Sequence, residues 1–514
     1  MLNIPPFGRV LPVLLLGLFA ANAEATSFRV QCPPTTAMHP GLPGPNGTTL
    51  PDPAIKCQQI SGGDGFATMA DGTQTYLFAF GPLSGLADIV KGLPGTVSAS
   101  MFNTVAPTGL GIGFPLPADN TNPATLYQGA VGLVPDPESS PPNQIDGHVD
   151  PRPIMDVGVL NGNMPAPLMA IDEDDEFFLT LTNVGQIMRP DLFEQHTVHF
   201  HGYPNASAFY DGVPDASVAI NIGGSFTYYY LAPDAGTYFW HCHITPPEHL
   251  QMGMVGQLYV RPRQNRLPVG GSLYGGLLAQ QTDLRTKCGD DILCSTPLPA
   301  SNGGATHVAN KMYAYNDGDG TTAYDVEYPI QIHGFDPNFH FHGMTFNPEP
   351  FTDMKDKYFL LNGRSYPDTI SEGPMHTQAA DGTEHFSQPL PTIINIPSGG
   401  KALLRFADLD VTEMQTLASL GIPMHVVGYN AKLLRDMAGN NMAYDTNSIT
   451  LGGGESLDVI LDASDTTKHP VGAIYYLYTP NLDHLSNDAE NFGGLMTEVH
   501  ICSAVDPSTK VCTL

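Results

Sequence analysis

One stretch, GTYFWHCHITPPEHLQMGMVGQLYV at residues 236–260, constrains the fold of this chain more than any other. It places Cys242 between two histidines, with His249 seven residues on and Met254 twelve residues on. Thiolate, imidazole and a weak thioether on one loop form the ligand set of a blue-copper centre, through which one electron passes with little rearrangement. The second imidazole has to come from elsewhere in the same β-sandwich, and His196 is the candidate. The stretch therefore predicts a copper ion that transfers electrons.

A second set of histidines surrounds the first. HTVHFHG begins at His196 and HCH begins at His241. A lone Cys-His pair is more often a buried thiol beside a structural histidine, but here HxxHxHG, HCH, a further histidine and GM all fall between residues 196 and 254. At these motifs the sequence resembles the multicopper oxidase family of the cupredoxin superfamily, and within it the bacterial oxidases of the manganese-oxidising sort.

The resemblance implies two copper sites in the first domain. A type 1 copper would take His196, Cys242, His249 and Met254 as ligands. A type 2 copper, or a trinuclear type 2/3 cluster, would take His199, His201, His241 and His243. One departure is visible: the gap from Cys242 to His249 is two residues longer than the family pattern leads us to expect, which indicates a reshaped loop.

Composition indicates an all-β protein of two or three domains, since 54 glycines and 47 prolines punctuate 514 residues and the apolar runs are short. The 51 acidic and 21 basic residues give a formal charge of −30. Such a charge argues against nucleic acid or an anionic membrane as a partner, and it favours cationic substrates or soluble redox partners.

The first residues predict export. Arg9 precedes the apolar run LPVLLLGLFA, which is too short to span a bilayer and ends in a small-x-small cleavage site at residue 23. No later stretch predicts a transmembrane anchor. We therefore expect a periplasmic, secreted or cell-surface protein. Six cysteines remain beside Cys242, and proximity suggests the following pairs among fifteen connectivities: Cys32 with Cys57, Cys288 with Cys294, and Cys502 with Cys512.

The strand patterns predict two cupredoxin-like Greek-key β-sandwiches after a signal peptide. The expected segments are a signal at 1–23, a loop-rich arm at 24–60, domain 1 at 61–263 with a Gly/Pro-rich surface insertion at about 83–155, a connector at 264–356, domain 2 at 357–503 and a tail at 504–514.

The copper motifs of the second domain are degenerate. GAIYYLYT aligns with GTYFWHCH and puts Leu477, Tyr478 and Thr479 opposite the HCH triplet, so a second blue copper is excluded. IPMHVVG aligns with HTVHFHG and keeps only His425. Candidates for further ligands are His340 and His342 of a second HFHG, together with His425; less well placed are His333, His376, His385 and His484.

Three functions stay open at this point. A trinuclear cluster needs eight imidazoles from two domains, and the first domain offers four. A copper nitrite reductase would instead hold one type 2 copper with His201, His241 and the His425 of a neighbouring subunit. Against this, His199 and Phe406 stand where such enzymes have an aspartate and a catalytic histidine. A blue-copper electron carrier without a catalytic site is the third alternative.

We favour an exported copper oxidoreductase of the multicopper oxidase type. It would take electrons from a small-molecule or metal-ion reductant, such as Mn(II) or Fe(II), at the type 1 copper. It would pass them through the neighbours of Cys242 to a histidine-bound copper site that reduces dioxygen. A homo-oligomer, such as a trimer, is compatible with this reading.

Overall fold

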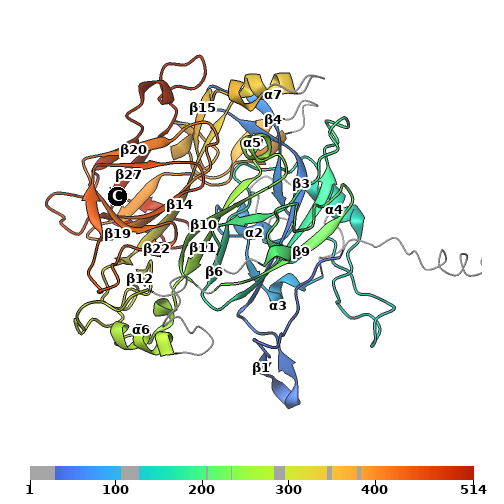
Figure 1. Cartoon of the computed structure of the whole chain (residues 1–514), viewed down its shortest axis with the longest axis horizontal. Helices are drawn as coiled ribbons and strands as arrows, with labels where there is room; N and C mark the ends of the chain where they lie inside the picture. Colours follow the sequence, from blue (N-terminus) through green and yellow to red (C-terminus); the bar gives the residue numbers. More distant parts are fainter. Residues whose placement is uncertain are drawn as a thin grey trace, which may run out of the picture.

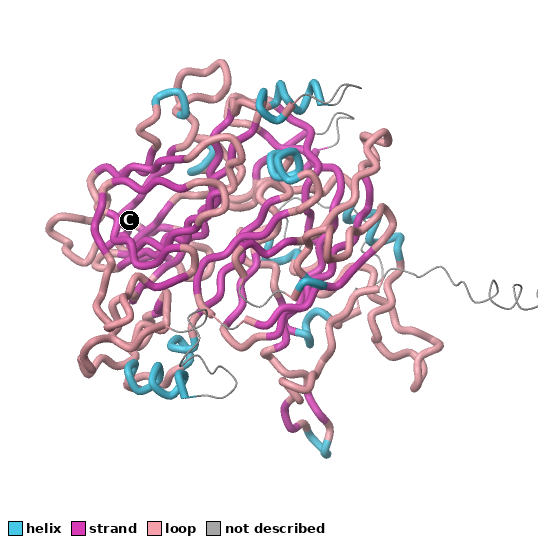
Figure 2. The backbone as a smooth tube through the Cα atoms, viewed as in Figure 1, coloured by secondary structure: helices cyan, strands magenta, loops and turns pink. Residues whose placement is uncertain are grey.

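The computed structural model describes residues 29–105, 127–203, 207–232, 234–282, 296–343, 350–378 and 384–514, except for the side chains at 282, 341–343, 378 and 384–386. Strands run through both halves of this part of the chain, with short helices around them (Figure 1; Figure 2). The predicted all-β class with two cupredoxin-like sandwiches is confirmed. The predicted signal at 1–23 lies outside the described residues.

The first sandwich consists of two sheets. One has the order β6-β11-β10-β8, and the other has the order β4-β3-β7-β9 with β5 paired to β3. The strands are β3 (Ile55–Thr68), β4 (Gln74–Pro82), β5 (Val97–Ser98), β6 (Met169–Asp172), β7 (Glu176–Gly185), β8 (His199–His201), β9 (Ser225–Leu231), β10 (Gly236–His241) and β11 (Val255–Arg261).

The second sandwich repeats this plan. Its sheets have the orders β15-β14-β19-β25-β21-β22, with β23 paired to β21, and β18-β27-β26-β20-β24. The strands are β14 (Val326–Phe335), β15 (Tyr358–Leu361), β18 (Ile394–Pro397), β19 (Lys401–Asp408), β20 (Gln415–Leu420), β21 (Met424–Tyr429), β22 (Lys432–Leu433), β23 (Tyr444–Thr446), β24 (Ser448–Leu451), β25 (Ser456–Asp462), β26 (Ile474–Tyr478) and β27 (Met496–Cys502).

Smaller elements border the sandwiches. The two-stranded sheets pair β1 (Leu42–Pro43) with β2 (Thr49–Leu50), β12 (Met312–Tyr313) with β13 (Ala323–Tyr324), β16 (Met375–Gln378) with β17 (Glu384–Ser387), and β28 (Ala504–Val505) with β29 (Cys512–Thr513). The helices are α2 (Leu86–Ile89), α3 (Ala99–Phe102), α4 (Pro151–Gly158), α5 (Pro246–Gln251), α6 (Leu273–Thr282) and α7 (Pro337–Gly343). Short 3-10 turns are η1 (Pro45–Gly47), η3 (Ala208–Tyr210), η4 (Arg263–Arg266), η6 (Phe351–Asp353), η7 (Asp368–Ile370) and η8 (Leu482–His484).

Strand β10 is buried on both faces, which explains its unbroken aromatic run. Alternate side chains of a strand point to opposite faces. Tyr238 and Trp240 enter the core of the first sandwich. Phe239 points the other way and packs with Ala407 and Leu409 of the second sandwich. The two sandwiches therefore meet directly across β10, and His241 leaves this strand at their junction.

The segment 83–155 differs from the expected surface insertion. Its described part contributes α2, α3 and α4 and a buried apolar cluster, in which Val97, Phe102 and Ile154 pack with Ile55 and Cys57. The apolar residues are spaced irregularly among glycines and prolines, so no strand or helix period reveals them. The segment is a structural layer against the first sandwich.

Two predicted boundaries need correction. Strand β14 lies inside the expected connector at 264–356, yet it pairs with β15 and β19 in the second sandwich. Strand β3 likewise begins inside the expected arm at 24–60. Pro329 in the middle of β14 breaks the sequence pattern of a strand. It can be accommodated because β15 pairs only with residues 332–335 of β14, so one side of β14 is an edge at Pro329.

The predicted alignment of the two domains is also corrected. β20 is the neighbour of β26, as β8 is the neighbour of β10, so the counterpart of HTVHFHG is QTLASL at 415–420 and not IPMHVVG. Leu477 enters the second core as Trp240 enters the first. Tyr478, Thr479 and Pro480 therefore stand opposite the HCH triplet, one residue later than the sequence alignment placed them. The absence of ligands there is unchanged.

Two of the three predicted disulfides are present. Cys32 is bonded to Cys57, and Cys502 is bonded to Cys512. The third predicted pair, Cys288 and Cys294, lies outside the described residues. Cys242 is buried and carries a free thiol.

Candidate metal centre

The first cluster joins three side chains that are distant in sequence. One donor atom each of His196, Cys242 and His249 lie within 4.8 Å of one another, and all three residues are 0% exposed. His196 precedes β8 and is held by a backbone bridge to Ile220. Cys242 follows β10, and His249 lies in α5. The cluster therefore forms at one end of the sandwich, where the strand ends meet.

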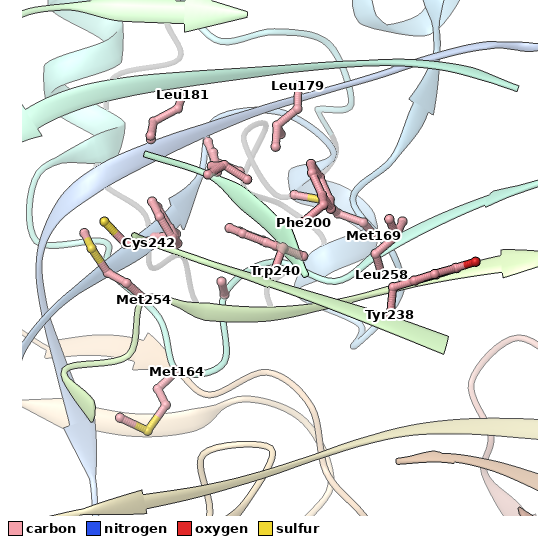
Figure 3. Close-up of a cluster of buried hydrophobic side chains, with 14 of the residues drawn as sticks. Met164, Met169, Leu179, Leu181, Phe200, Tyr238, Trp240, Cys242, Met254 and Leu258 are labelled. Carbon is pink, nitrogen blue, oxygen red and sulfur yellow. The ribbon is translucent and has the colours of Figure 1, made fainter. Parts of the chain in front are cut away.

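Met254 closes the loop that carries the cluster. Its carbonyl accepts a hydrogen bond from the Cys242 amide at 3.1 Å, and its own amide donates to the His249 carbonyl at 3.0 Å. The sulfur-bearing side chains of Cys242 and Met254 lie side by side in the buried core (Figure 3). The ring of Phe78 contacts the His249 ring edge to face at 5.0 Å between centroids. A thioether, a thiolate and two imidazoles thus share one dry environment.

The long gap between Cys242 and His249 is occupied by helix α5. Thr245 adopts a left-handed conformation with φ of 39°, and the two prolines that follow begin the helix. Proline suits the first helical turn because its fixed φ is helical and its missing N–H has no partner there anyway. The helix turns the chain back so that His249 reaches Cys242, with 3.3 Å between Nδ1 and Sγ. The extra residues therefore preserve the cluster.

Electrostatics prepare the thiol for a cation. Burial raises the pKa of Cys242, but the charge and hydrogen bond of His249 and the Thr197 amide outweigh burial and lower that pKa. Burial lowers the pKa of His249, but the Cys242 thiolate and Glu194 outweigh it and raise the pKa to about 9. These two shifts favour the thiolate form of Cys242 beside the imidazolium form of His249. A metal ion can replace the proton as the partner of the thiolate.

The residues of the first cluster fit a copper ion. His196 Nδ1 is buried and has no hydrogen-bond partner among the described residues, which is costly for a polar atom unless a ligand satisfies it. Burial also lowers the pKa of His196 well below its usual value, so its imidazole is neutral. Two imidazoles, a thiolate and a nearby thioether form the donor set that copper prefers in electron-transfer sites.

A second cluster lies on the other side of the HCH triplet. Donor atoms of His199, His201 and His241 lie within 4.8 Å of one another. The ring of His243 is 5.1 Å from that of His199 and 5.6 Å from that of His241. Strands β8 and β10 set this geometry, because His199 is paired with His241 in register and His201 shares its face. All four predicted imidazoles are brought together.

Hydrogen bonds to backbone carbonyls orient two of these rings. His199 Nδ1 donates to the Asp211 carbonyl at 2.6 Å, and His241 Nδ1 donates to the Cys242 carbonyl at 2.8 Å. A carbonyl only accepts, so each ring carries its proton on Nδ1 and offers the lone pair of Nε2. Burial lowers the pKa of His241 to about 3. Both rings therefore offer a free Nε2 lone pair to the cavity side of the cluster.

The second cluster opens into a cavity of about 470 Å³ between the sandwiches. His201 and His241 line it from the first sandwich, and Asp410 and Glu413 line it from the second. Gly454 approaches closely, since a Cβ there would lie 3.4 Å from His201 Nε2. Glu413 lies 3.2 Å from Nε2 of the buried His484. Within the described residues, the second sandwich thus contributes carboxylates rather than imidazoles to this cavity.

The predicted additional ligands lie elsewhere. His340 is in helix α7, where its Nε2 is 2.9 Å from Gln251 Oε1 and its ring stacks on Phe335. His425 lies on β21, and its Nδ1 is 2.8 Å from Oδ1 of Asp445 on β23. The side chain of His342 lies outside the described residues. Neither His340 nor His425 belongs to a metal-binding group that the described part of the chain forms.

Sequence reasoning missed the carboxylates of the cavity. Asp410 and Glu413 follow β19 directly, in the stretch ADLDVTE. Phe406, which the comparison with nitrite reductases placed near a catalytic position, is buried in the core of the second sandwich. The signal was present in the acidic residues at the strand end, but only the packing of the two sandwiches shows that this end faces His201.

The matches to known proteins concentrate on the segment that holds both clusters. A family model described as multicopper oxidase matches residues 146–265. Laccase abr2 of Aspergillus fumigatus is 34% identical over 109 residues, which cover 21% of this chain and 17% of the laccase. A copper-containing nitrite reductase of Rhizobium meliloti is 34% identical over 109 residues, which cover 20% of this chain and 26% of the reductase.

The chain thus aligns with only about a fifth of the length of these curated relatives. Among solved structures, a blue copper oxidase from Nitrosomonas europaea covers 87% of this chain and 85% of its own, with a TM-score of 0.47 and 17% identity. Within the described residues, no helix has the length and apolar character needed to cross a bilayer. All eight predicted ligands lie inside residues 146–265, the segment that matches the multicopper oxidase family model.

Proposed function

We propose that the chain is a copper-dependent oxidoreductase of the multicopper oxidase type. The first cluster would hold a type 1 copper with His196, Cys242, His249 and Met254. The second would hold copper with His199, His201, His241 and His243. One observation carries the proposal: the backbone links the two clusters directly. Cys242 belongs to the first cluster, and the rings of its chain neighbours His241 and His243 belong to the second.

Bound copper would supply one-electron redox chemistry at both clusters. The chain's own residues keep the two environments distinct. The first cluster is sealed by apolar side chains such as Phe78 and Met254, which exclude water from the thiolate. The second opens to the cavity, where His201 has an exposed ring that stacks on Phe239 at 4.4 Å. Electrons would enter through the first cluster and leave through the second.

The net charge of the chain and the different exposure of the two clusters indicate which substrates each cluster would meet. A reductant, either a small molecule or a metal ion, would approach a chain of formal charge −30, which attracts cations such as Mn(II) or Fe(II). Dioxygen would be the acceptor in the cavity, and Asp410 and Glu413 are the acidic residues placed to deliver protons there. We also propose that the protein is exported and acts in a periplasmic, secreted or cell-surface location.

A nitrite-reductase-like function is the second candidate, and one observation favours it. The described part of the second sandwich brings no histidine into the cavity, so the described residues of one chain offer imidazoles for fewer copper ions than a trinuclear cluster holds. A homo-oligomer such as a trimer could complete the site across subunits. Nitrite would then replace dioxygen as the acceptor.

Copper stoichiometry separates these functions. We expect about four coppers per chain for an oxidase with a trinuclear cluster, two for a nitrite reductase and one for an electron carrier. Electron paramagnetic resonance on the same sample distinguishes type 1 from type 2 copper. Dioxygen consumption and nitrite reduction are then assayed on the loaded protein. A copper-loaded protein that stays colourless when oxidised would overturn the proposal.

A further inference from the structure

A second cavity, of about 580 Å³, lies apart from the one over the histidines and shares no lining residue with it. Five regions supply most of its lining: the loop at 91–94 from the layer against the first sandwich, the end of β11, the start of β14, the segment 389–395 and the segment 507–511. Its volume falls within the roughly 300–1,000 Å³ that small-molecule sites occupy. The cavity therefore needs an explanation of its own.

One wall of this cavity is apolar and rigid. Leu168, Tyr259 and Leu390 form a small buried cluster along it, exposed by 4%, 3% and 7%. Prolines at 94, 329, 389, 391 and 507 also line it. Proline fixes its own backbone φ, so these segments lose little freedom when a ligand binds. The wall is preformed for an apolar group.

The lining also carries positive charge. Lys91, Arg261 and Lys510 line the cavity, against the carboxylates Glu327 and Glu372. Glu327 is already neutralised, because it accepts hydrogen bonds from Arg261 at 2.7 Å and from the buried Arg405 at 3.0 Å. Burial raises the pKa of Glu327, but the two arginines outweigh it and bring that pKa to about 2.

Lys510 is a lining cation without an ion pair. Its ammonium feels the charges of Glu327, Arg261 and Asp506 over distance, yet no carboxylate within the described residues forms an ion pair with it. Partial burial lowers the pKa of this lysine. The backbone around it is fixed, since the Lys510 carbonyl accepts a hydrogen bond from Asn395 at 2.9 Å and the Cys502–Cys512 disulfide closes the hairpin. A partly buried ammonium without an ion pair, on a hairpin held in this way, is arranged to meet an anion.

The charge balance of the whole chain makes this arrangement stand out. The sequence has 51 acidic and only 21 basic residues. An excess of cations in one concave site, with a low-dielectric wall, concentrates the local field and selects anions that the rest of the surface repels. We propose that this cavity binds a small organic anion, whose acidic group contacts Lys510 and whose aromatic or aliphatic body packs on Leu168, Tyr259 and Leu390.

The probe 1-anilinonaphthalene-8-sulfonate tests the proposal, because it joins an aromatic body to one anionic group and fluoresces when shielded from water. It is titrated into the full chain, into Lys510→Gln and into Lys468→Gln. Lys468 is 76% exposed and lies outside the lining, so its variant removes the same charge elsewhere. We expect Lys510→Gln to weaken binding about tenfold, the usual effect of losing one charged hydrogen bond, and Lys468→Gln to leave it within twofold.

Three further measurements keep the test decisive. Lys510→Arg should retain binding, and N-phenyl-1-naphthylamine, which has the same rings without the sulfonate, should bind equally to the unmodified chain and to the lysine variants. Leu390→Trp should abolish sulfonate binding by filling the cavity. Equal loss in Lys510→Gln and Lys468→Gln, no binding by the unmodified chain, or full binding by Leu390→Trp would each overturn the proposal. None of these readouts depends on copper or turnover.

Discussion

The loops that close β10–β11 and β26–β27 occupy equivalent positions in the two sandwiches and have the same backbone pattern. In the first, the Cys242 amide donates to the Met254 carbonyl at 3.1 Å, and in the second the Thr479 amide donates to the Leu495 carbonyl at 2.9 Å. Met254 donates to the His249 carbonyl at 3.0 Å, and Leu495 donates to the His484 carbonyl at 3.0 Å. These pairs align three positions of the two loops: Cys242 with Thr479, His249 with His484, and Met254 with Leu495.

The side chains at these positions differ in their ability to bind a metal. Thr479 and Leu495 replace Cys242 and Met254, while His484 remains at the place of His249. His484 Nδ1 is 2.8 Å from Oε1 of Gln415, the first residue of β20, and β20 lies beside β26 as β8 lies beside β10. The histidine thus keeps its place by bonding an amide and stacking on Phe359 at 3.9 Å. The backbone frame of a metal site belongs to the fold, and the ligands alone decide whether metal binds.

The largest effect should follow from removing the thiolate. Cys242→Ser is expected to abolish the intense visible absorption and the turnover together, because a hydroxyl does not replace the thiolate of a blue-copper site. The loss should exceed the roughly 10–100-fold that removing a supporting residue costs. Thr479→Ser, at the equivalent position of the second loop, is the matched control and should change neither. Turnover that survives without the chromophore would refute the proposed electron route.

A smaller and more selective effect is expected from His201→Ala. It removes one imidazole from the second cluster and leaves the first cluster intact, so copper content and turnover should fall while the visible absorption stays. His425→Ala is the control, because His425 contacts Asp445 and not the cavity. Metal analysis and absorption spectra on both variants check this. Equal copper loss in the two variants would instead support His425 as a ligand from a neighbouring subunit.

The comparison of the two loops can be sharpened by giving the loop between β26 and β27 the donor side chains of the first loop. The triple variant Gln415→His, Thr479→Cys and Leu495→Met gives the second loop the donor set of the first, with His484 already present. We expect one additional copper per chain and added visible absorption. The variant built on Cys242→Ser isolates this new signal from the original one. If copper binds without colour, the loops share a backbone pattern but not a ligand geometry.

Much of the fold and of the first site could be predicted from the sequence, because the ligands are chemically distinctive and their spacing places them at strand ends. Alternation on β8 correctly put His199 and His201 on one face. The second domain was aligned to the wrong strand, since MHVVG is similar in letters to HTVHFHG while its true counterpart QTLASL has lost every histidine. Where ligands disappear, only strand pairing identifies the equivalent positions.

The cavity residues escaped prediction for a different reason. Asp410, Glu413 and Lys510 belong to loops, whose positions depend on how two sandwiches and a hairpin pack together. Nothing in local sequence encodes that packing. The role of His484 was equally hidden, because its position depends on a hydrogen bond between residues 484 and 495 that no motif records.

The smallest expected effect is a change of the free energy of unfolding with pH, caused by Asp356, which contacts the end of α5. Asp356 accepts a hydrogen bond from Gln251, the last residue of this helix, and another from Thr412 beside Asp410. Burial, together with the neighbouring charge of Asp410, raises the pKa of Asp356 to about 8. Unfolding returns that pKa to about 4. Between these values the folded chain binds more protons than the unfolded chain, so the free energy of unfolding falls as pH rises from about 4 to 8.

Urea denaturation at several pH values between 5 and 8 measures this slope. Asp356→Asn should flatten it, by no more than about 1.4 kcal/mol per pH unit, which is the value for one proton. Asp483→Asn, at an exposed position on η8, should leave the slope unchanged. Because Asp356 joins the second sandwich to the helix that carries His249, the same titration should loosen the first cluster before it affects the metal-free loop around His484. If the free energy of unfolding of Asp356→Asn still falls with pH as steeply, other groups cause the pH dependence. Asp356 would then not couple the stability of the first loop to pH.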